Sequence, residues 1–149
     1  MKVLQLVARR QLRGAEVFAA QLGERLAAHG LDVVLAGLYP PREPAPAPRG
    51  VRQVDLAPEP FGRLAWRPVR ALAALLDRER FDLVQANGSD TLKYSVLARA
   101  WSGRAVPIVY RNISVMSHWL RGPLHRRFNR WLLSRVERVV AVSETSRQD

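Results

Sequence analysis

The sequence contains no cysteine, which excludes a disulfide framework and a thiolate metal site. Its three histidines, His29, His118 and His125, are not spaced as metal ligands. No apolar run is long enough to span a bilayer, and the apolar stretch after Met1 is too short for a signal peptide. We therefore expect a cytoplasmic globular protein whose chemistry requires no metal and no other cofactor.

Acidic residues are also scarce. The chain has 13 Asp and Glu residues against 24 Lys and Arg residues, which gives a net charge of +11. Only Lys2 and Lys93 are lysines, so a coding bias toward arginine could account for the total charge. Local basic clusters are more informative, and they favour an anionic partner such as a phosphorylated ligand, an anionic membrane surface or nucleic acid.

Familiar nucleotide-binding motifs are missing as well. Neither G-x-G-x-x-G nor G-x-x-x-x-G-K-[ST] occurs, and the second apolar segment ends in Leu38-Tyr39-Pro40 where a dinucleotide fold has an acid. No Ser-His-acid set can be identified from the spacing of these residues. The sequence therefore predicts neither an ordinary dinucleotide site nor a self-contained hydrolase.

The regular feature of the chain is an alternation of short apolar segments and helical patterns. The expected strands are 2–8, 32–38, 51–56, 81–87, 106–112 and 138–142, and the expected helices are 14–29, 67–80, a segment that begins at Ser89 or Asp90, and 123–137. A proline-rich stretch, 39–50, is expected to form an extended surface loop. This alternation predicts a single α/β domain over 1–149. We expect a Rossmann-like parallel sheet of about six strands in the order 3-2-1-4-5-6, with helices on both faces.

In such a sheet, ligands bind outside the carboxyl ends of the strands. The residues at these ends are the candidate substrate-binding residues, namely Arg13, Gly14, Asn87, Gly88, Ser89, Asp90, Arg111, Ser143 and Glu144, with Asn112 as the candidate catalytic residue. Gly14 lacks a Cβ and would let phosphate or sugar oxygens approach a helix N-terminus. The alternative is that Gly14 only eases a tight turn between a strand and a helix.

Three stretches, "RGAEVFAAQLGERLAAHGLDVVLAGL", "FDLVQANG" and "RVERVVAVSETSRQD", together resemble the amino-terminal domain of family-4 glycosyltransferases. The resemblance implies one half of a GT-B fold, in which two Rossmann-like domains face a cleft. It also implies transfer of a hexosyl group from a nucleotide sugar to a cell-envelope, lipid-linked or small-molecule acceptor. The family's donor-binding domain has no counterpart in this chain. We therefore expect an acceptor-side fragment that is inactive alone.

The sequence departs from the family pattern at three positions. The first glycine of the family's turn falls on Arg13, and the histidine that often follows strand five falls on Asn112. A histidine position in strand four falls on or near Asn87. Asparagine forms hydrogen bonds but does not titrate near neutral pH. A retaining front-face transfer needs no protein nucleophile, so Asn112 does not exclude activity. It does leave the acid/base assignment open.

The segment 117–139 combines six arginines, two tryptophans and one acid. One interpretation is an amphipathic helix whose stripe of Leu124, Phe128, Trp131, Leu132 and Val136 packs on the sheet. A compatible interpretation is a peripheral contact with the inner face of the cytoplasmic membrane through Trp119, Arg126, Arg127 and Arg130. A nucleic-acid-binding module, or a non-catalytic Rossmann-like binding module, is the alternative, although no helix-turn-helix, RNP or zinc motif supports nucleic-acid binding.

Overall fold

The computed structural model describes residues 1–58, 65–113 and 122–143, and six strands alternate with four helices over this part of the chain. In chain order these are β1 (Lys2–Val7), α1 (Gly14–Ala28), β2 (Asp32–Gly37), β3 (Arg52–Asp55), α2 (Trp66–Glu79), β4 (Leu83–Asn87), α3 (Ser89–Ser102), β5 (Ile108–Asn112), α4 (Pro123–Leu133) and β6 (Arg138–Ala141). Residues 38–51 form no helix or strand, as expected for the proline-rich loop.

All strand pairs are parallel, and the sheet order is β3-β2-β1-β4-β5-β6. This order confirms the predicted Rossmann-like α/β fold. The chain moves from β1 to β2 on one side, while β4 pairs with β1 on its other side. The direction of strand addition therefore reverses between β1 and β4. The crevice outside their carboxyl ends is where such sheets bind ligands.

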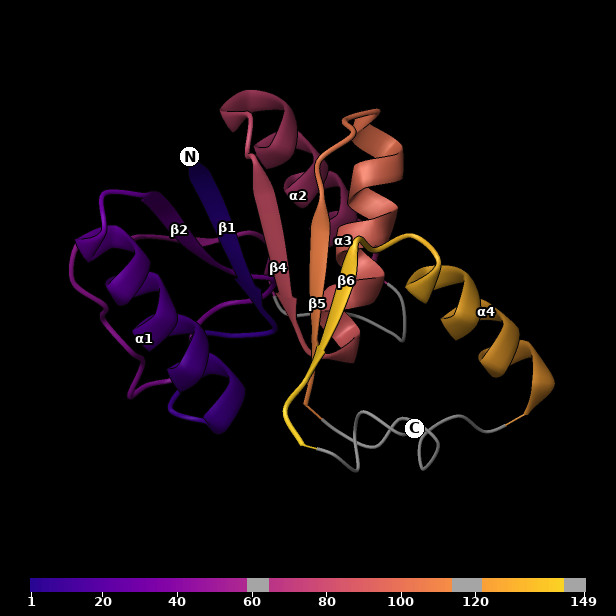
Figure 1. The fold of residues 1–149 in the computed structure, drawn as a ribbon, viewed down its shortest axis with the longest axis horizontal. Helices are drawn as coiled ribbons and strands as arrows, with labels where there is room; N and C mark the ends of the chain where they lie inside the picture. Colours follow the sequence, from indigo (N-terminus) through magenta and orange to yellow (C-terminus); the bar gives the residue numbers. More distant parts are fainter. Residues whose placement is uncertain (59–64, 114–121, 144–149) are drawn as a thin grey trace.

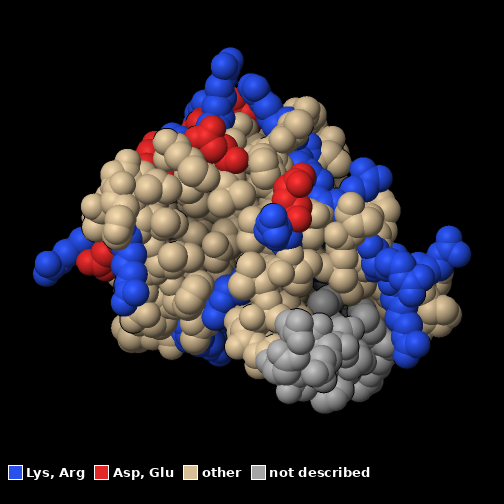
Figure 2. All heavy atoms as spheres, viewed as in Figure 1, with Lys and Arg blue, Asp and Glu red and all other residues tan. Residues whose placement is uncertain are grey.

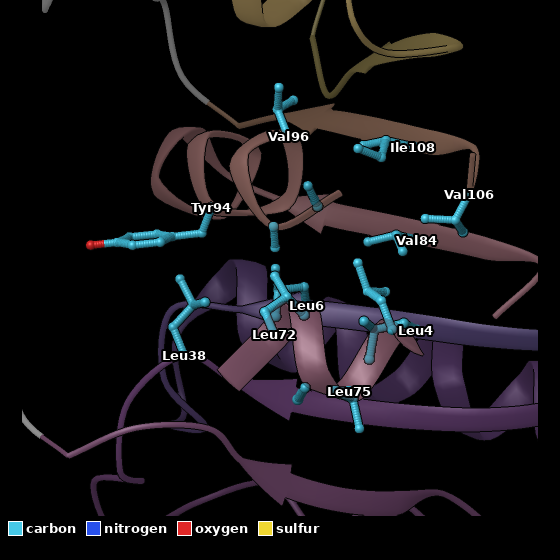
Figure 3. Packing of buried hydrophobic residues seen from close by; sticks show 14 of the residues in the cluster. Leu4, Leu6, Leu38, Leu72, Leu75, Val84, Tyr94, Val96, Val106 and Ile108 are labelled. Atoms are coloured by element: carbon cyan, nitrogen blue, oxygen red, sulfur yellow. The ribbon is translucent and has the colours of Figure 1, made fainter. Parts of the chain in front are cut away.

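The two faces of the sheet are covered differently (Figure 1). On one face α1 packs against β1 and β2, while α2 and α3 pack together on the other. The larger core lies between the sheet and α2 and α3, where Leu4, Leu6, Leu72, Val84 and Ile108 are almost completely buried (Figure 3). The helical spacing of Val69, Leu72, Ala73 and Leu76 gives α2 the apolar face that this core requires.

Helix α1 packs on the sheet through small residues. Its buried positions include Ala19, Ala20 and Gly23, whereas Phe18 stays exposed. A Cβ placed on Gly23 would be 3.5 Å from side-chain atoms of Val33 and Val51, so the helix backbone lies close to the strands. Phe18, a large apolar residue of this helix, therefore lies outside its buried face. Close approach of a helix to a sheet leaves room for alanine and glycine at the centre of the contact.

Helix α4 is shorter than predicted and barely packs. It ends at Leu133, and of its predicted stripe only Leu132 is fully buried. Leu124 is 80% exposed, and Phe128 and Trp131 are also exposed, with their rings stacked 5.8 Å apart. The main helix that α4 contacts is α3, and Figure 1 shows α4 standing off beyond the β6 side of the sheet. The prediction that this stripe packs on the sheet is wrong for Leu124, Phe128 and Trp131.

Candidate functional site

A pocket of about 330 Å³ lies at the carboxyl ends of β1 and β4. The first turn of α1 and the first turn of α3 both border it, so two helix N-termini meet at one cavity. The lining residues are Ala8, Arg13, Gly14, Ala15, Glu16, Asn87, Gly88, Ser89, Asp90, Thr91 and Ile113. Free backbone N–H groups and the positive ends of two helix dipoles make this position favourable for an anion.

Two glycines in the pocket have different roles. A Cβ on Gly14 would meet no atom within 4 Å, so the fold imposes no steric demand for glycine there. Gly88 has a φ of +112°, and its Cβ would also approach Ile113 Cδ1 at 3.4 Å. Residues other than glycine rarely adopt that φ, so the backbone conformation requires glycine at position 88. Gly14 leaves open space at the start of α1, where a ligand could approach.

Of the three arginines that follow β1, only Arg13 lines the pocket. Arg10 forms a bidentate pair with Asp55, with N–O distances of 3.0 and 2.6 Å. Arg9 donates to the carbonyl of Pro40 and lies 5.3 Å from the ring centroid of Tyr39. Arg9 and Arg10 therefore brace the loops beside β2 and β3, and Arg13 is the cation available to a ligand.

Asn87 lies at the floor of the pocket and belongs to a polar network within the sheet. Its Nδ2 donates to Gln5 Oε1 and to the carbonyl of Leu6, both at 3.2 Å, and its Oδ1 accepts from Gln85 Nε2 at 3.1 Å. Asn87 is 4% exposed. Its amide is therefore largely engaged in joining β1 to β4, and it shapes the floor of the pocket.

Sequence reasoning missed Glu16. This carboxylate lies in the first turn of α1, lines the pocket and is buried. The bond that Gln11 Nε2 donates to Glu16 Oε1 is long, at 3.4 Å. Two features of the sequence could have singled it out, namely an acid two residues after Gly14 and its place at the start of a helix whose N-terminus favours negative charge.

The structure places Asn112 and Arg111 outside the lining of this pocket. Asn112 is buried, and its Oδ1 accepts from the Tyr110 hydroxyl at 3.3 Å. Arg111 lies on the opposite face of β5, with its guanidinium 3.8 Å from the ring centroid of Phe18 on α1. Its Nη1 is buried and has no hydrogen-bond partner among the described residues, and burial lowers the pKa of this arginine. Their neighbour Ile113 reaches the pocket instead.

Asp90, which lines the pocket, forms an ion pair with Lys93 at 3.3 Å. Ser143 is exposed at the end of β6 and does not line the pocket. Glu144 and Trp119 lie outside the described residues. Arg126, Arg127 and Arg130 are exposed on α4, and Lys and Arg side chains gather on the side of the molecule where α4 lies (Figure 2).

Residues 1–58, 65–113 and 122–143 contain no group of three or more His, Asp and Glu side chains arranged to hold a metal ion. None of the helices in this part combines the length and apolar character that crossing a membrane requires.

The six-stranded parallel sheet with helices on both faces matches one half of a GT-B fold. The model of Glycosyltransferase Family 4 matches residues 12–149, and the chain belongs to that family. No curated protein matches the chain in sequence.

Solved structures agree with this assignment at the level of the fold. HepE from Anabaena, in complex with UDP and glucose, superposes with a TM-score of 0.68 at 20% identity and covers 99% of this chain. The lipopolysaccharide outer core galactosyltransferase WaaB gives 0.70 at 12% identity and 99% coverage, and MurG from Acinetobacter baumannii gives 0.60 at 14% and 97%. This chain spans 40%, 41% and 42% of those three chains, respectively.

Proposed function

We propose that this chain is the acceptor-side half of a glycosyltransferase that moves a hexosyl group from a nucleotide sugar to a hydroxyl acceptor. The observation that carries the proposal is the pocket where the N-termini of α1 and α3 meet beside Arg13. HepE, whose fold this chain shares, was solved with UDP and glucose, which supports a nucleotide-sugar donor. The donor would lie between this pocket and a second domain, with no metal required.

Within the pocket, cationic and anionic groups would bind different parts of the donor. Arg13 and the N–H groups at Gly14 and Ser89 favour the phosphate oxygens of the donor. Glu16 provides a carboxylate that accepts hydrogen bonds from sugar hydroxyls, and Asp90 extends the same polar wall. Asn112 accepts a hydrogen bond from Tyr110 at the end of β5. Because Asn112 lies outside the pocket lining, it would contact only a ligand that extends beyond the pocket. Arg111 and Ser143 lie outside the pocket lining and would contact only those parts of a ligand that extend toward β5 and β6.

The proposed partner of α4 is an anionic membrane surface at the inner face of the cytoplasmic membrane. Leu124, Phe128 and Trp131, the α4 ridge, are exposed, and Arg126, Arg127 and Arg130 lie on the same helix. Apolar side chains flanked by arginines match the boundary between acyl chains and anionic headgroups. The acceptor would then be lipid-linked and would approach the pocket from the membrane.

The test is Gly14→Val in the complete transferase. The added side chain would fill the open space at the start of α1, where we place the ligand oxygens. Losing one charge-assisted hydrogen bond costs about 1.5–3 kcal/mol, so kcat/KM should fall roughly ten- to a hundredfold. The free energy of unfolding should change by less than about 1 kcal/mol, because valine is a better helix former than glycine.

The matched control is Ala28→Val, which places the same side chain at the exposed C-terminal end of α1. It should leave both transfer and stability unchanged. A Gly14→Val protein that transfers sugar at the normal rate contradicts the proposed ligand position, and one that unfolds shows that Gly14 is only structural. Residues 1–149 alone should show no transfer, since the family's donor-binding half is not among them.

A further inference from the structure

A second cavity lies between α3 and the end of α4. Its volume is about 250 Å³, and its lining includes Val96, Arg99, Ala100, Arg104, Trp131 and Arg135. We call it the α3–α4 cleft. Trp131 also belongs to the α4 ridge, so the cleft and the ridge form one continuous surface.

The cleft is basic. Three arginines line it, and none of its lining residues in the described part of the chain is acidic, although the charge of Glu137 acts on Arg99. Asp77 pairs with Arg104 at 3.5 Å but lies outside the lining, and both side chains of that pair are about half exposed. Arg104 and Arg135 are exposed and can turn their guanidinium groups toward a ligand. Two planar guanidinium groups can bind the oxygens of a phosphate in a forked geometry.

Arg99 has a different task in the same cleft. Its guanidinium donates to the carbonyl of Val106 at 3.2 Å and to the carbonyl of Arg135. These bonds fix the chain that follows α4 against the chain that follows α3. They hold the Arg135 side chain at the cleft, where its guanidinium lies 5.3 Å from the ring centroid of Trp131. Arg99 thus positions Arg135 from within the fold.

We propose that the α3–α4 cleft binds the phosphate of an anionic lipid headgroup, with Arg104 and Arg135 as its ligands and Trp131 at the boundary between headgroup and acyl chain. This proposal rests on the membrane contact proposed for the α4 ridge. Trp131 supports a lipid source over a soluble phosphate, because it joins the basic cleft to an exposed apolar ridge. Tryptophan side chains favour this boundary in membranes.

The experiment uses the full chain and compares vesicles of phosphatidylcholine doped with phosphatidic acid or with phosphatidylglycerol, adjusted to equal surface charge. Diffuse attraction depends on charge and treats the two lipids alike. A forked site prefers the phosphomonoester, which offers more charged oxygens. The unmodified chain should bind phosphatidic acid vesicles roughly tenfold more tightly, which is the gain of about one further charge-assisted hydrogen bond.

Three double variants distinguish binding in the cleft from attraction by the general positive charge of the chain. Arg104→Gln with Arg135→Gln should lose the preference between lipids. Arg104→Lys with Arg135→Lys should also lose it while keeping the general attraction, because lysine has the charge without the fork. Arg126→Gln with Arg127→Gln should weaken binding to both vesicles, by roughly fivefold per arginine, and keep the preference.

Equal binding of the unmodified chain to the two vesicles overturns the cleft site and leaves the membrane contact standing. A preference for phosphatidic acid that persists in both double variants at Arg104 and Arg135 also overturns the cleft site. If the chain binds neither vesicle, the membrane contact and the cleft site fall together. Glycerol 1-phosphate that binds the chain as tightly as the vesicles do overturns the lipid source in favour of a soluble phosphate.

Discussion

Helices α2 and α4 have similar patterns of apolar and basic residues but lie in opposite environments. Both alternate apolar residues with arginines at helical spacing. Helix α2 buries Pro68, Val69, Leu72, Ala73, Leu75 and Leu76, whereas α4 buries Leu132 alone. Helix α2 packs against α3 and the sheet core, while the α4 ridge is exposed. An amphipathic pattern therefore shows which face of a helix is apolar, but does not show whether protein or another medium covers that face.

The largest expected effect is on stability, and it separates the two helices directly. Leu72 is 0% exposed, so Leu72→Ala should lower the free energy of unfolding by about 2–5 kcal/mol. Leu124→Ala should change it by no more than about 0.5 kcal/mol, because that side chain contacts little. Urea denaturation followed by circular dichroism measures both. Equal losses would mean that the protein itself covers the α4 ridge.

A second, smaller effect concerns membrane binding. Leu124→Ser with Phe128→Ser should lower binding to anionic vesicles roughly ten- to a hundredfold, because each apolar side chain contributes about 1.5–3 kcal/mol when fully buried and less at an interface. Vesicle co-sedimentation measures the loss, and the stability should not change. The control is Leu12→Ser, an exposed leucine before α1. If the serine pair binds vesicles normally while the chain binds generic DNA tightly and salt-sensitively, the nucleic-acid alternative is favoured.

The smallest expected effect concerns the C-terminal end of α2. Glu79 contacts Lys2 Nζ at 3.1 Å and also pairs with Arg52 and Arg78. Burial alone would raise the pKa of Glu79, but hydrogen bonds from Arg78 and Lys2 and the charge of Arg52 lower it overall, below the ordinary value of 4.5. The ionised form therefore stabilises the fold above that value, and this contribution is lost as the pH falls through the lowered pKa.

Glu79→Gln should consequently cost about 1 kcal/mol at neutral pH, and the difference from the unmodified chain should vanish in acid. Denaturation curves recorded from neutral pH to a pH below the lowered pKa of Glu79 test the sign of this pH dependence. Glu137→Gln, an exposed acid beyond α4, serves as the control and should leave the free energy of unfolding unchanged in dilute solution. A cost at Glu79 that persists unchanged in acid contradicts the assignment of its stabilising role to the ionised form.

The fold could be predicted largely because its signals are local. Short apolar runs such as KVLQLV and DVVLAG are typical of strands buried on both faces, and the helical patterns between them require parallel strands. The ends of elements were less predictable. The fourth strand begins at Leu83, two residues later than expected, because Arg80 takes a left-handed conformation that ends α2. The C-terminal end of α4 was overestimated because Val136 continues its apolar spacing.

The site was predictable where backbone geometry decides it. Arg13, Gly14 and Gly88 line one pocket because the ends of β1 and β4 are neighbours. Asn112 is different, because alternation along β5 puts it on the same face as the buried Tyr110. That alternation was readable from the sequence. The contact of Arg111 with Phe18 joins residues distant in the chain, so no local sequence pattern predicts it.

Strand β6 has a consequence for handling this chain in concentrated solution. Val139, Val140 and Val142 are each about half exposed, so both faces of this short β-branched strand are open. Such segments recruit other chains by edge-to-edge pairing. Glu137 and Arg138 stand directly before the valines and act as gatekeepers, since charges at the flank of an apolar strand oppose the stacking of identical copies. Replacing either by an uncharged residue would favour self-association even though neither contributes to the core.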